Sequence, residues 1–214
     1  MTITRPALGR GALRALIIAA SLTIAVATGL AIWFVEWTFT RPFAFGVAYA
    51  GPDFPAVAST TETQQFWGDV VIESDAPLTA ARILSAIATA LPLLVYIAAA
   101  IGVIVLALRM STARSFRPAG RVALVSVAVA SLVTAVVRPL FEALAVAEAT
   151  AALRLPTSGD DVADPTRDPW VVPAGFDLLQ DMDWPYLGIA VVLALVALLW
   201  SRAERMQKDT EGLV

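Results

Sequence analysis

Three charged residues that border uncharged stretches are the best candidates for chemistry in this chain: Glu36, Arg138 and Glu142. Arg138 and Glu142 are four residues apart, the spacing that places two side chains on one face of a helix. Glu36 directly follows an uncharged stretch, so we expect it at a similar depth. Ionisable residues at membrane depth are commonly paired and functional, which predicts an interhelical polar cluster of the three. In the alternative interpretation, which we favour, all three lie at the membrane interface, where the arginine reaches phosphate and the carboxylates meet water.

The composition removes most other routes to catalysis. The 214 residues include no Cys and no His, which excludes disulfides, thiolate nucleophiles, cysteine-ligated zinc and an imidazole base. An acidic run offers oxygen ligands for calcium, but it lacks the spacing of a calcium-binding loop and is interrupted by prolines. Its residues are Asp160, Asp161, Asp164 and Asp168. We interpret this run as a solvated loop, and we predict a non-enzymatic protein with no catalytic residue, metal site or cofactor.

The apolar residues are concentrated in long stretches that must form the elements of the fold. Hydrophobic residues make up 58% of the chain and charged residues only 15%, whereas soluble domains are about 25% charged. Four stretches contain no Asp, Glu, Lys or Arg: 15–35, 83–108, 122–137 and 184–201. A bilayer core needs about 20 apolar helical residues. The sequence therefore predicts an all-α membrane protein, with one membrane domain over 1–214 and a bundle of four transmembrane helices at about 13–37, 83–108, 121–147 and 185–201.

The distribution of charge predicts the orientation of these spans. The N-terminal segment, the loop at about 109–120 with the start of the third span, and the C-terminal tail together carry ten basic and three acidic residues. The segments on the other side of the spans carry five basic and 15 acidic residues. Because cytoplasmic segments retain positive charge, we expect both termini in the cytoplasm and two acidic segments outside.

The N-terminal stretch has a second interpretation as a cleaved signal peptide. Arg5, Arg10 and Arg14 precede an apolar run, and the segment 25–27 has the small-residue pattern of a cleavage site. The apolar residues nevertheless continue without a break to Val35. That length favours an uncleaved first membrane helix.

The two outer segments, at about 38–82 and 148–184, contain strand patterns. Residues 43–50 alternate large and small side chains, which is the two-residue period of a β-strand. The segment 66–73 has a β-branched centre, and 170–172 is a third short candidate. We expect a small β-rich cap outside the membrane, built from both segments. The alternative is a pair of irregular loops.

The C-terminal tail and the basic loop carry a family resemblance. The tail, which can continue the last helix until Gly212 ends it, finishes in Thr-Glu-Gly-Leu-Val, and the loop contains Ser115-Phe116 followed by Arg121. In these features the chain resembles a widespread bacterial family of uncharacterised four-span inner-membrane proteins, a domain of unknown function with a similar C-terminus. The loop departs from the family pattern in placing Pro118 after Phe116. The resemblance implies the bacterial inner membrane and a partnership with a small helix-turn-helix regulator.

These features predict an interaction or regulatory component of the cell membrane. Its partners are the lipid bilayer and a cytoplasmic protein that contacts the basic loop and the end of the tail, with no direct binding of nucleic acid. The contact residues we expect are Arg114, Arg117, Arg121, Leu213 and Val214. The alternative is a small transport or channel-accessory subunit, in which the cluster of Glu36, Arg138 and Glu142 belongs to a solute path.

Overall fold

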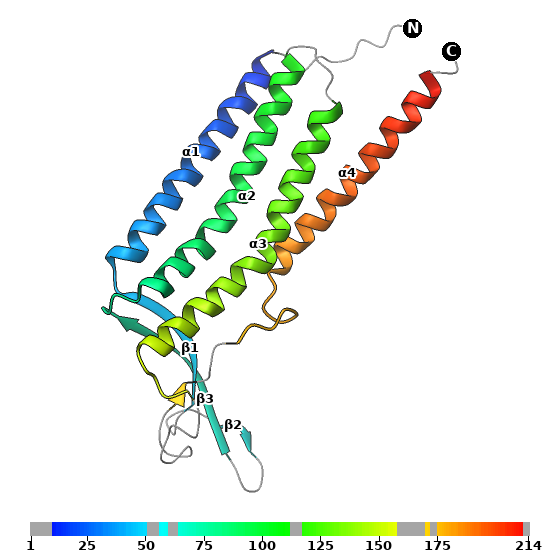
Figure 1. Ribbon diagram of the computed structural model, residues 1–214. Coiled ribbons are helices and arrows are strands. Elements are labelled where there is room, and N and C mark those ends of the chain that lie inside the picture. Colours follow the sequence, from blue (N-terminus) through cyan, green and yellow to red (C-terminus); the bar gives the residue numbers. More distant parts are fainter. Residues whose placement is uncertain are drawn as a thin grey trace. The chain divides into compact units, whose positions relative to one another are not determined.

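The fold is mostly helical. The computed structural model describes residues 10–50, 56–59, 64–111, 117–157, 170–171 and 175–211. In chain order its elements are α1 (Arg10–Thr40), β1 (Phe43–Ala50), β2 (Ala56–Ser59), β3 (Gln64–Ser74), α2 (Thr79–Ser111), α3 (Arg117–Ala152), β4 (Trp170–Val171) and α4 (Trp184–Glu211) (Figure 1).

All four helices are long and apolar enough to cross a membrane. The qualifying stretches are Gly11–Thr40, Thr79–Met110, Gly120–Ala152 and Trp184–Arg202. The shortest has 19 residues, close to the roughly 20 that a bilayer core requires. The chain therefore has the architecture of a multi-pass membrane protein, as the uncharged stretches predicted.

The helices extend further than the predicted spans. α2 begins at Thr79 and α3 continues to Ala152, so the α1–α2 and α3–α4 connections are shorter than the expected segments 38–82 and 148–184. The expected loop at 109–120 shrinks to 112–116, because α2 ends at Ser111 and α3 begins at Arg117. The predicted limits were placed where charged residues appear. Charge marks the limit of the hydrocarbon, but a helix continues past it wherever its backbone hydrogen bonds can form.

Within the one membrane domain that the sequence predicts, the backbone packs as two compact units. The first unit contains residues 1–32, 90–136 and 182–214, and the second contains 33–89 and 137–181. The first unit thus holds stretches of all four helices. The second holds the remaining stretches of α1, α2 and α3 together with the strands.

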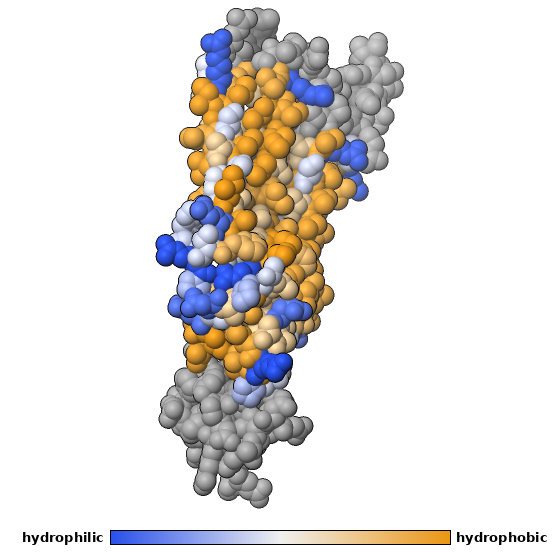
Figure 2. Space-filling view, turned by 60° about the vertical axis from the view of Figure 1, so that its left-hand side comes forward, coloured by the Kyte–Doolittle hydropathy of each residue, from blue (hydrophilic) through white to orange (hydrophobic). Residues whose placement is uncertain are grey.

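The first unit is packed through small side chains. α1 buries Leu13, Ala20 and Ala27, and α4 buries Ala190 and Ala197. The seven-residue interval is the repeat of helices that pack side by side with a left-handed crossing. Large apolar side chains point outward instead, and Figure 2 shows a predominantly hydrophobic surface over the helices on the face that it presents. Such a surface is suited to lipid, because lipid tails solvate apolar side chains.

Two glycines mark close contacts between helices of the first unit. A Cβ added to Gly102 of α2 would lie 3.2 Å from the Cβ of Ala123 on α3. A Cβ added to Gly120 of α3 would lie 3.5 Å from the Trp200 ring of α4. The absence of a side chain at Gly102 therefore lets α2 and α3 approach closely, whereas a Cβ at position 120 would make ordinary van der Waals contact.

The second unit contains a four-stranded sheet in the order β2-β3-β1-β4. β1 pairs antiparallel with β3 along its whole length, from Phe43 opposite Ser74 to Ala50 opposite Trp67. On its other edge β1 pairs antiparallel with β4, with Tyr49 opposite Val171. The strands expected near 43–50, 66–73 and 170–172 are therefore present, and β2 is an additional strand.

One face of this sheet forms the core of the second unit. Phe43, Phe45 and Val47 alternate along β1 and are all buried, and they pack with Leu78 and with residues of α2, α3 and β4. Val71 of β3, in register with the exposed Gly46, is 67% exposed. The two-residue period of the strand thus separates a packed face from an open one.

The end of α3 directs the chain toward β4. Arg154 has a φ of 52°, the left-handed conformation that ends many helices. Its amide donates to the carbonyl of Ala151, and the amide of Leu155 donates to the carbonyl of Thr150, both at 3.1 Å. These two bonds form a Schellman motif, which satisfies carbonyl groups of the last turn.

Candidate functional site

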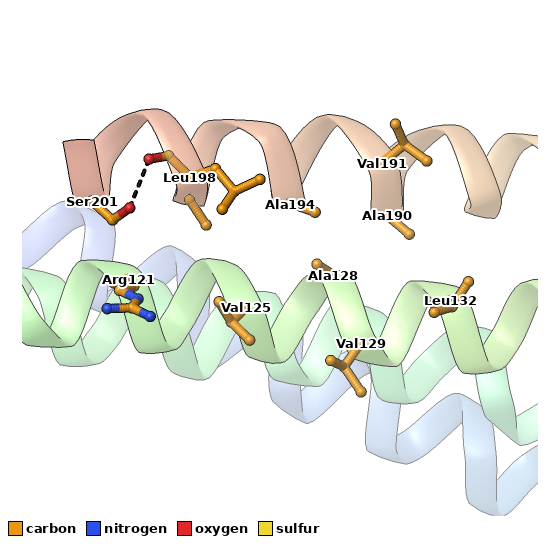
Figure 3. Close-up of a pocket in the computed structure, with 11 residues that line it drawn as sticks. Arg121, Val125, Ala128, Val129, Leu132, Ala190, Val191, Ala194, Leu198 and Ser201 are labelled. Atoms are coloured by element: carbon orange, nitrogen blue, oxygen red, sulfur yellow. Dashed lines mark hydrogen bonds between the residues drawn. The ribbon is translucent and has the colours of Figure 1, made fainter. Parts of the chain in front are cut away.

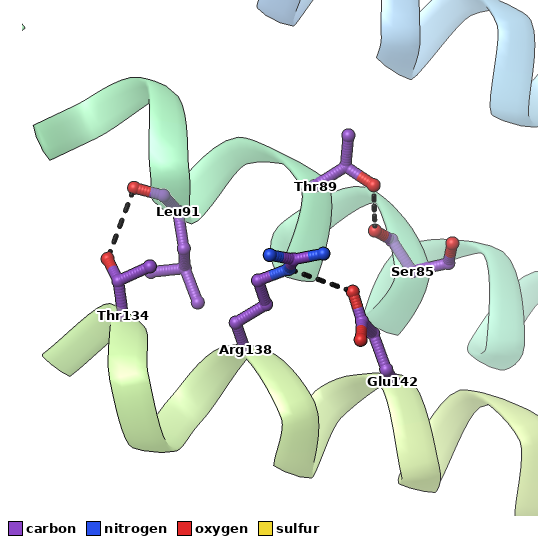
Figure 4. A network of polar contacts seen from close by, with 6 residues as sticks. All are labelled: Ser85, Thr89, Leu91, Thr134, Arg138 and Glu142. Carbon is purple, nitrogen blue, oxygen red and sulfur yellow. Dashed lines mark hydrogen bonds and ion pairs between the residues drawn. The ribbon is translucent and has the colours of Figure 1, made fainter. Parts of the chain in front are cut away.

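Arg138 and Glu142 form an ion pair on α3, within the second unit. Nε of Arg138 lies 3.0 Å from Oε1 of Glu142. Figure 4 shows both side chains directed toward Ser85 and Thr89 of α2, whose hydroxyl groups bring further polarity to this side of the helix. The Arg138 and Glu142 side chains are 36% and 50% exposed. Surface ion pairs of this kind contribute little to stability.

Glu36 is not a member of this ion pair. It is exposed on α1, and its carbonyl oxygen accepts a hydrogen bond from the Thr40 hydroxyl at 2.8 Å. The structure therefore brings together two of the three residues predicted as a cluster. Arg138 and Glu142 meet because the helical repeat places them on one face, whereas the position of Glu36 also depends on the rotation of α1 about its axis.

Arg82, in the first turn of α2, is a buried charged residue of the second unit. Only 6% of its surface is exposed. Its Nη1 donates to the carbonyl oxygens of Thr38 and, at 2.8 Å, of Arg41, and its Nη2 donates to that of Ala76 at 3.4 Å. The guanidinium carbon also lies 5.6 Å from the centre of the Phe43 ring. We call Arg82 and these three carbonyl groups the Arg82 clamp.

The Arg82 clamp provides a donor for unpaired carbonyl groups and acceptors for a buried guanidinium. The last carbonyl groups of a helix lack intrahelical partners and carry partial negative charge, and Thr38 is in the last turn of α1. A buried guanidinium needs acceptors to offset the loss of its hydration. The two requirements meet where Arg82 faces the end of α1.

Arg82 is not among the residues that the sequence patterns single out. The position of Arg82 in the first turn of a helix could nevertheless have indicated a partner outside that helix. A cation in the first turn of a helix opposes the dipole of its own helix, so it indicates a partner elsewhere. The sequence does not say which carbonyl groups provide that partner.

Two hydroxyl groups lie inside the first unit. Thr134 of α3 donates to the carbonyl oxygen of Leu91 on α2 at 3.3 Å, beside Pro92 (Figure 4). Ser131 is fully buried, and its hydroxyl has no partner among the residues that the structure describes. Thr134 therefore adds a polar link between α2 and α3.

A groove of about 420 Å³ lies between α3 and α4 in the first unit (Figure 3). Most of its lining is alanine, valine and leucine, and Arg121 and Ser201 lie at one end. A second groove, of about 280 Å³, lies between α2 and α3, with Arg109 among its lining residues. Both grooves thus combine an apolar wall with an arginine from the end of a helix.

The residues predicted to contact a partner are described only in part. Arg121 is exposed and lines the α3/α4 groove. Arg117 begins α3, but its side chain lies outside the described part of the chain. Arg114, Leu213 and Val214 lie outside the described residues altogether. Their predicted role therefore stays a prediction.

Within the ranges that the structure describes, no group of three or more Asp, Glu, His or Cys side chains is placed to hold a metal ion. The acidic run between Asp160 and Asp168 lies outside those ranges.

No protein-family model matches this chain, and neither the curated proteins nor the solved structures contain a match. The resemblance of the tail and the basic loop to a bacterial four-span family therefore stays a prediction.

Proposed function

We propose that this protein is a non-enzymatic component of the bacterial inner membrane that acts by binding other proteins. Both termini lie in the cytoplasm, and the sheet of the second unit forms a cap on the outer side. The charge distribution supports this orientation, because ten of the 15 basic residues flank the spans on the side of the termini.

The observation that carries this proposal is the Arg82 clamp. One buried guanidinium holds the end of α1, the segment before α2 and the first residue of β1. Only Arg41 and Pro42 separate α1 from β1. A displacement of the sheet is therefore expected to move the last turn of α1 and the first turn of α2 with it.

The side chains buried in the first unit favour a protein-binding function over the transport of a solute. In the described part of this unit, the buried polar residues are Ser131 and Thr134, and most other buried positions are alanine. Paths for ions and polar solutes are lined by polar or ionisable groups. Helices that pack through alanine instead form a compact connector.

The cytoplasmic end of the proposed protein presents a helix to its partner. α4 extends to Glu211, about nine residues past the stretch that qualifies as a span. The partner is a soluble protein, and a small helix-turn-helix regulator is the class that the family resemblance implies. It contacts the basic loop and the apolar end of the tail.

Crosslinked capture from native membranes tests this function. We expect one soluble DNA-binding protein in reciprocal capture with the full chain, and its loss when residues 210–214 are deleted. Met206→Ala, which removes an exposed apolar side chain upstream on α4, serves as the matched control and should retain the partner. Equal recovery with the full and the shortened chain would contradict the proposal.

A transport or channel-accessory function is the second candidate. It is favoured by the Arg138–Glu142 pair, because that pair faces the hydroxyl-bearing residues Ser85 and Thr89 of α2 (Figure 4). Proton and potassium flux into proteoliposomes distinguishes the two functions. The interaction proposal predicts no flux above that of empty vesicles, and a flux abolished by Arg138→Leu would favour transport.

A further inference from the structure

The α3/α4 groove lies between two points at which α3 and α4 are in contact. At one end the Trp200 ring lies against Gly120, where an added Cβ would be 3.5 Å away. At the other end the amide of Asp183 donates to the carbonyl oxygen of Ala135 at 3.0 Å. Between these contacts both helices present small residues, among them Ala128, Ala190 and Ala194. The side chains are too short to close the space.

The length and the lining of the groove suit one acyl chain with a polar headgroup at one end. Its lining on α3 runs from Arg121 to Leu132, about 16 Å at the helical rise, which suits an extended hydrocarbon chain. Its walls are apolar and belong to a helix pair that qualifies as membrane-spanning. Arg121 and Ser201 place a cation and a hydroxyl at one end (Figure 3).

We propose that the α3/α4 groove binds an anionic phospholipid, with an acyl chain along the alanine-lined wall and the phosphate at Arg121. Contact with the acyl chain is not selective, because lipid tails everywhere are as apolar as the groove. The preference for this lipid comes from its headgroup, which is attracted to the guanidinium. One such charge near the membrane surface corresponds to about a five-fold preference over a zwitterionic lipid. This inference does not rest on the proposed partner, although Arg121 is also one of the residues expected to contact it.

The α2/α3 groove is a poorer candidate for the same lipid. Its volume is about 280 Å³ against about 420 Å³. Its arginine, Arg109, already interacts within the chain. We therefore assign the lipid to the α3/α4 groove alone.

Native mass spectrometry of the purified full chain tests the proposal. The protein is released from vesicles that contain equal amounts of phosphatidylglycerol and phosphatidylcholine with identical acyl chains. Both leaflets carry both lipids, so the result does not depend on orientation. We expect one retained phosphatidylglycerol per chain, favoured about five-fold over phosphatidylcholine.

Two pairs of variants distinguish recognition of the headgroup from binding of the acyl chain in the groove. Arg121→Gln should abolish the preference, whereas Arg14→Gln, an exposed arginine of α1 that lines neither groove, should keep it. Ala194→Phe fills the groove and should abolish retention of the lipid. Val192→Phe, an exposed position of α4 outside the groove, should leave retention unchanged. Helical circular dichroism confirms that each variant is folded.

Three results would overturn the assignment. The first is equal retention of the two lipids by the unaltered chain. The second is an unchanged preference in folded Arg121→Gln. The third is a doubled mass that Ala194→Phe returns to the monomer, because it would identify a second copy of the chain as the occupant.

Discussion

The interactions that stabilise the interior of each unit are different in the two units. In the second unit, three large side chains of β1 are buried in a mixed core, and a buried arginine binds three carbonyl groups. In the first unit, most buried apolar positions are alanine, and large side chains such as Ile18 and Leu199 face outward.

This difference follows from the surroundings that each unit requires. A core of large apolar side chains, as in the sheet of the second unit, is the arrangement that the hydrophobic effect favours. In lipid, burying a leucine side chain gives no hydrophobic free energy, because lipid tails are as apolar as leucine. Membrane helices therefore associate through small residues that permit close approach. The contrast predicts which substitutions will damage each unit.

The largest effect is expected in the sheet core. Phe45→Ala should destabilise the second unit by about 3–5 kcal/mol, because it leaves a cavity in a packed core. Val71→Ala, on the open face of the same sheet, should cost no more than about 0.5 kcal/mol. Hydrogen exchange of the β1 and β3 amides measures both. Similar losses for the two variants would show that the sheet has no packed face.

The next largest effect is expected at the Arg82 clamp. Arg82→Met should cost about 3 kcal/mol, because hydrogen bonds to a charged group are lost and buried carbonyl groups lose their donor. Arg41→Met is the matched control: this exposed arginine lies 5.0 Å from the Trp37 ring, a contact worth about 1 kcal/mol or less. Amide exchange in the last turn of α1 and in β1 reports the loss. Unchanged exchange in Arg82→Met would remove the clamp from the account.

A smaller effect is expected in the first unit. Gly102→Leu should cost about 1–3 kcal/mol, because its side chain must displace Ala123 from close contact. Gly29→Leu on α1 meets open space and should be tolerated. Thermal unfolding in detergent, followed by circular dichroism, compares the two. Equal stability of these variants would show that close approach of helices is not what holds this unit.

The smallest effect is expected at the exposed ion pair. Arg138→Leu should change stability by about 0.5 kcal/mol or less, since both partners are exposed and screened. Amide exchange along α3 provides the measurement. A loss as large as that of Arg82→Met would instead identify Arg138 as part of a buried polar network.

The sequence was sufficient wherever a pattern repeats along the chain. Uncharged stretches identified four spans, and the alternation of large and small residues identified β1, because both patterns depend only on neighbours in the chain. β2 was not expected, since Ala56–Ser59 has no run of β-branched residues. It is a strand because it pairs with β3.

Contacts between different helices and strands could not be predicted from these sequence patterns. Arg82 and Arg138 look alike as single charges at the ends of apolar stretches, yet the first is 6% exposed and the second has a 36% exposed side chain. The α3/α4 groove depends on where Gly120 and Trp200 meet, which lie 80 positions apart in the chain. Rotation and pairing of helices decide these features.

The central proposal is that the sheet of the second unit lies outside the membrane and that the short α2–α3 connection lies in the cytoplasm. Because the chain has no native cysteine, single-cysteine labelling tests this directly. In intact cells, a membrane-impermeant maleimide should label Asp75→Cys, in the segment between β3 and α2, and should label Ser111→Cys only after permeabilisation. Labelling of Ser111→Cys in intact cells, with Asp75→Cys protected, would contradict the account.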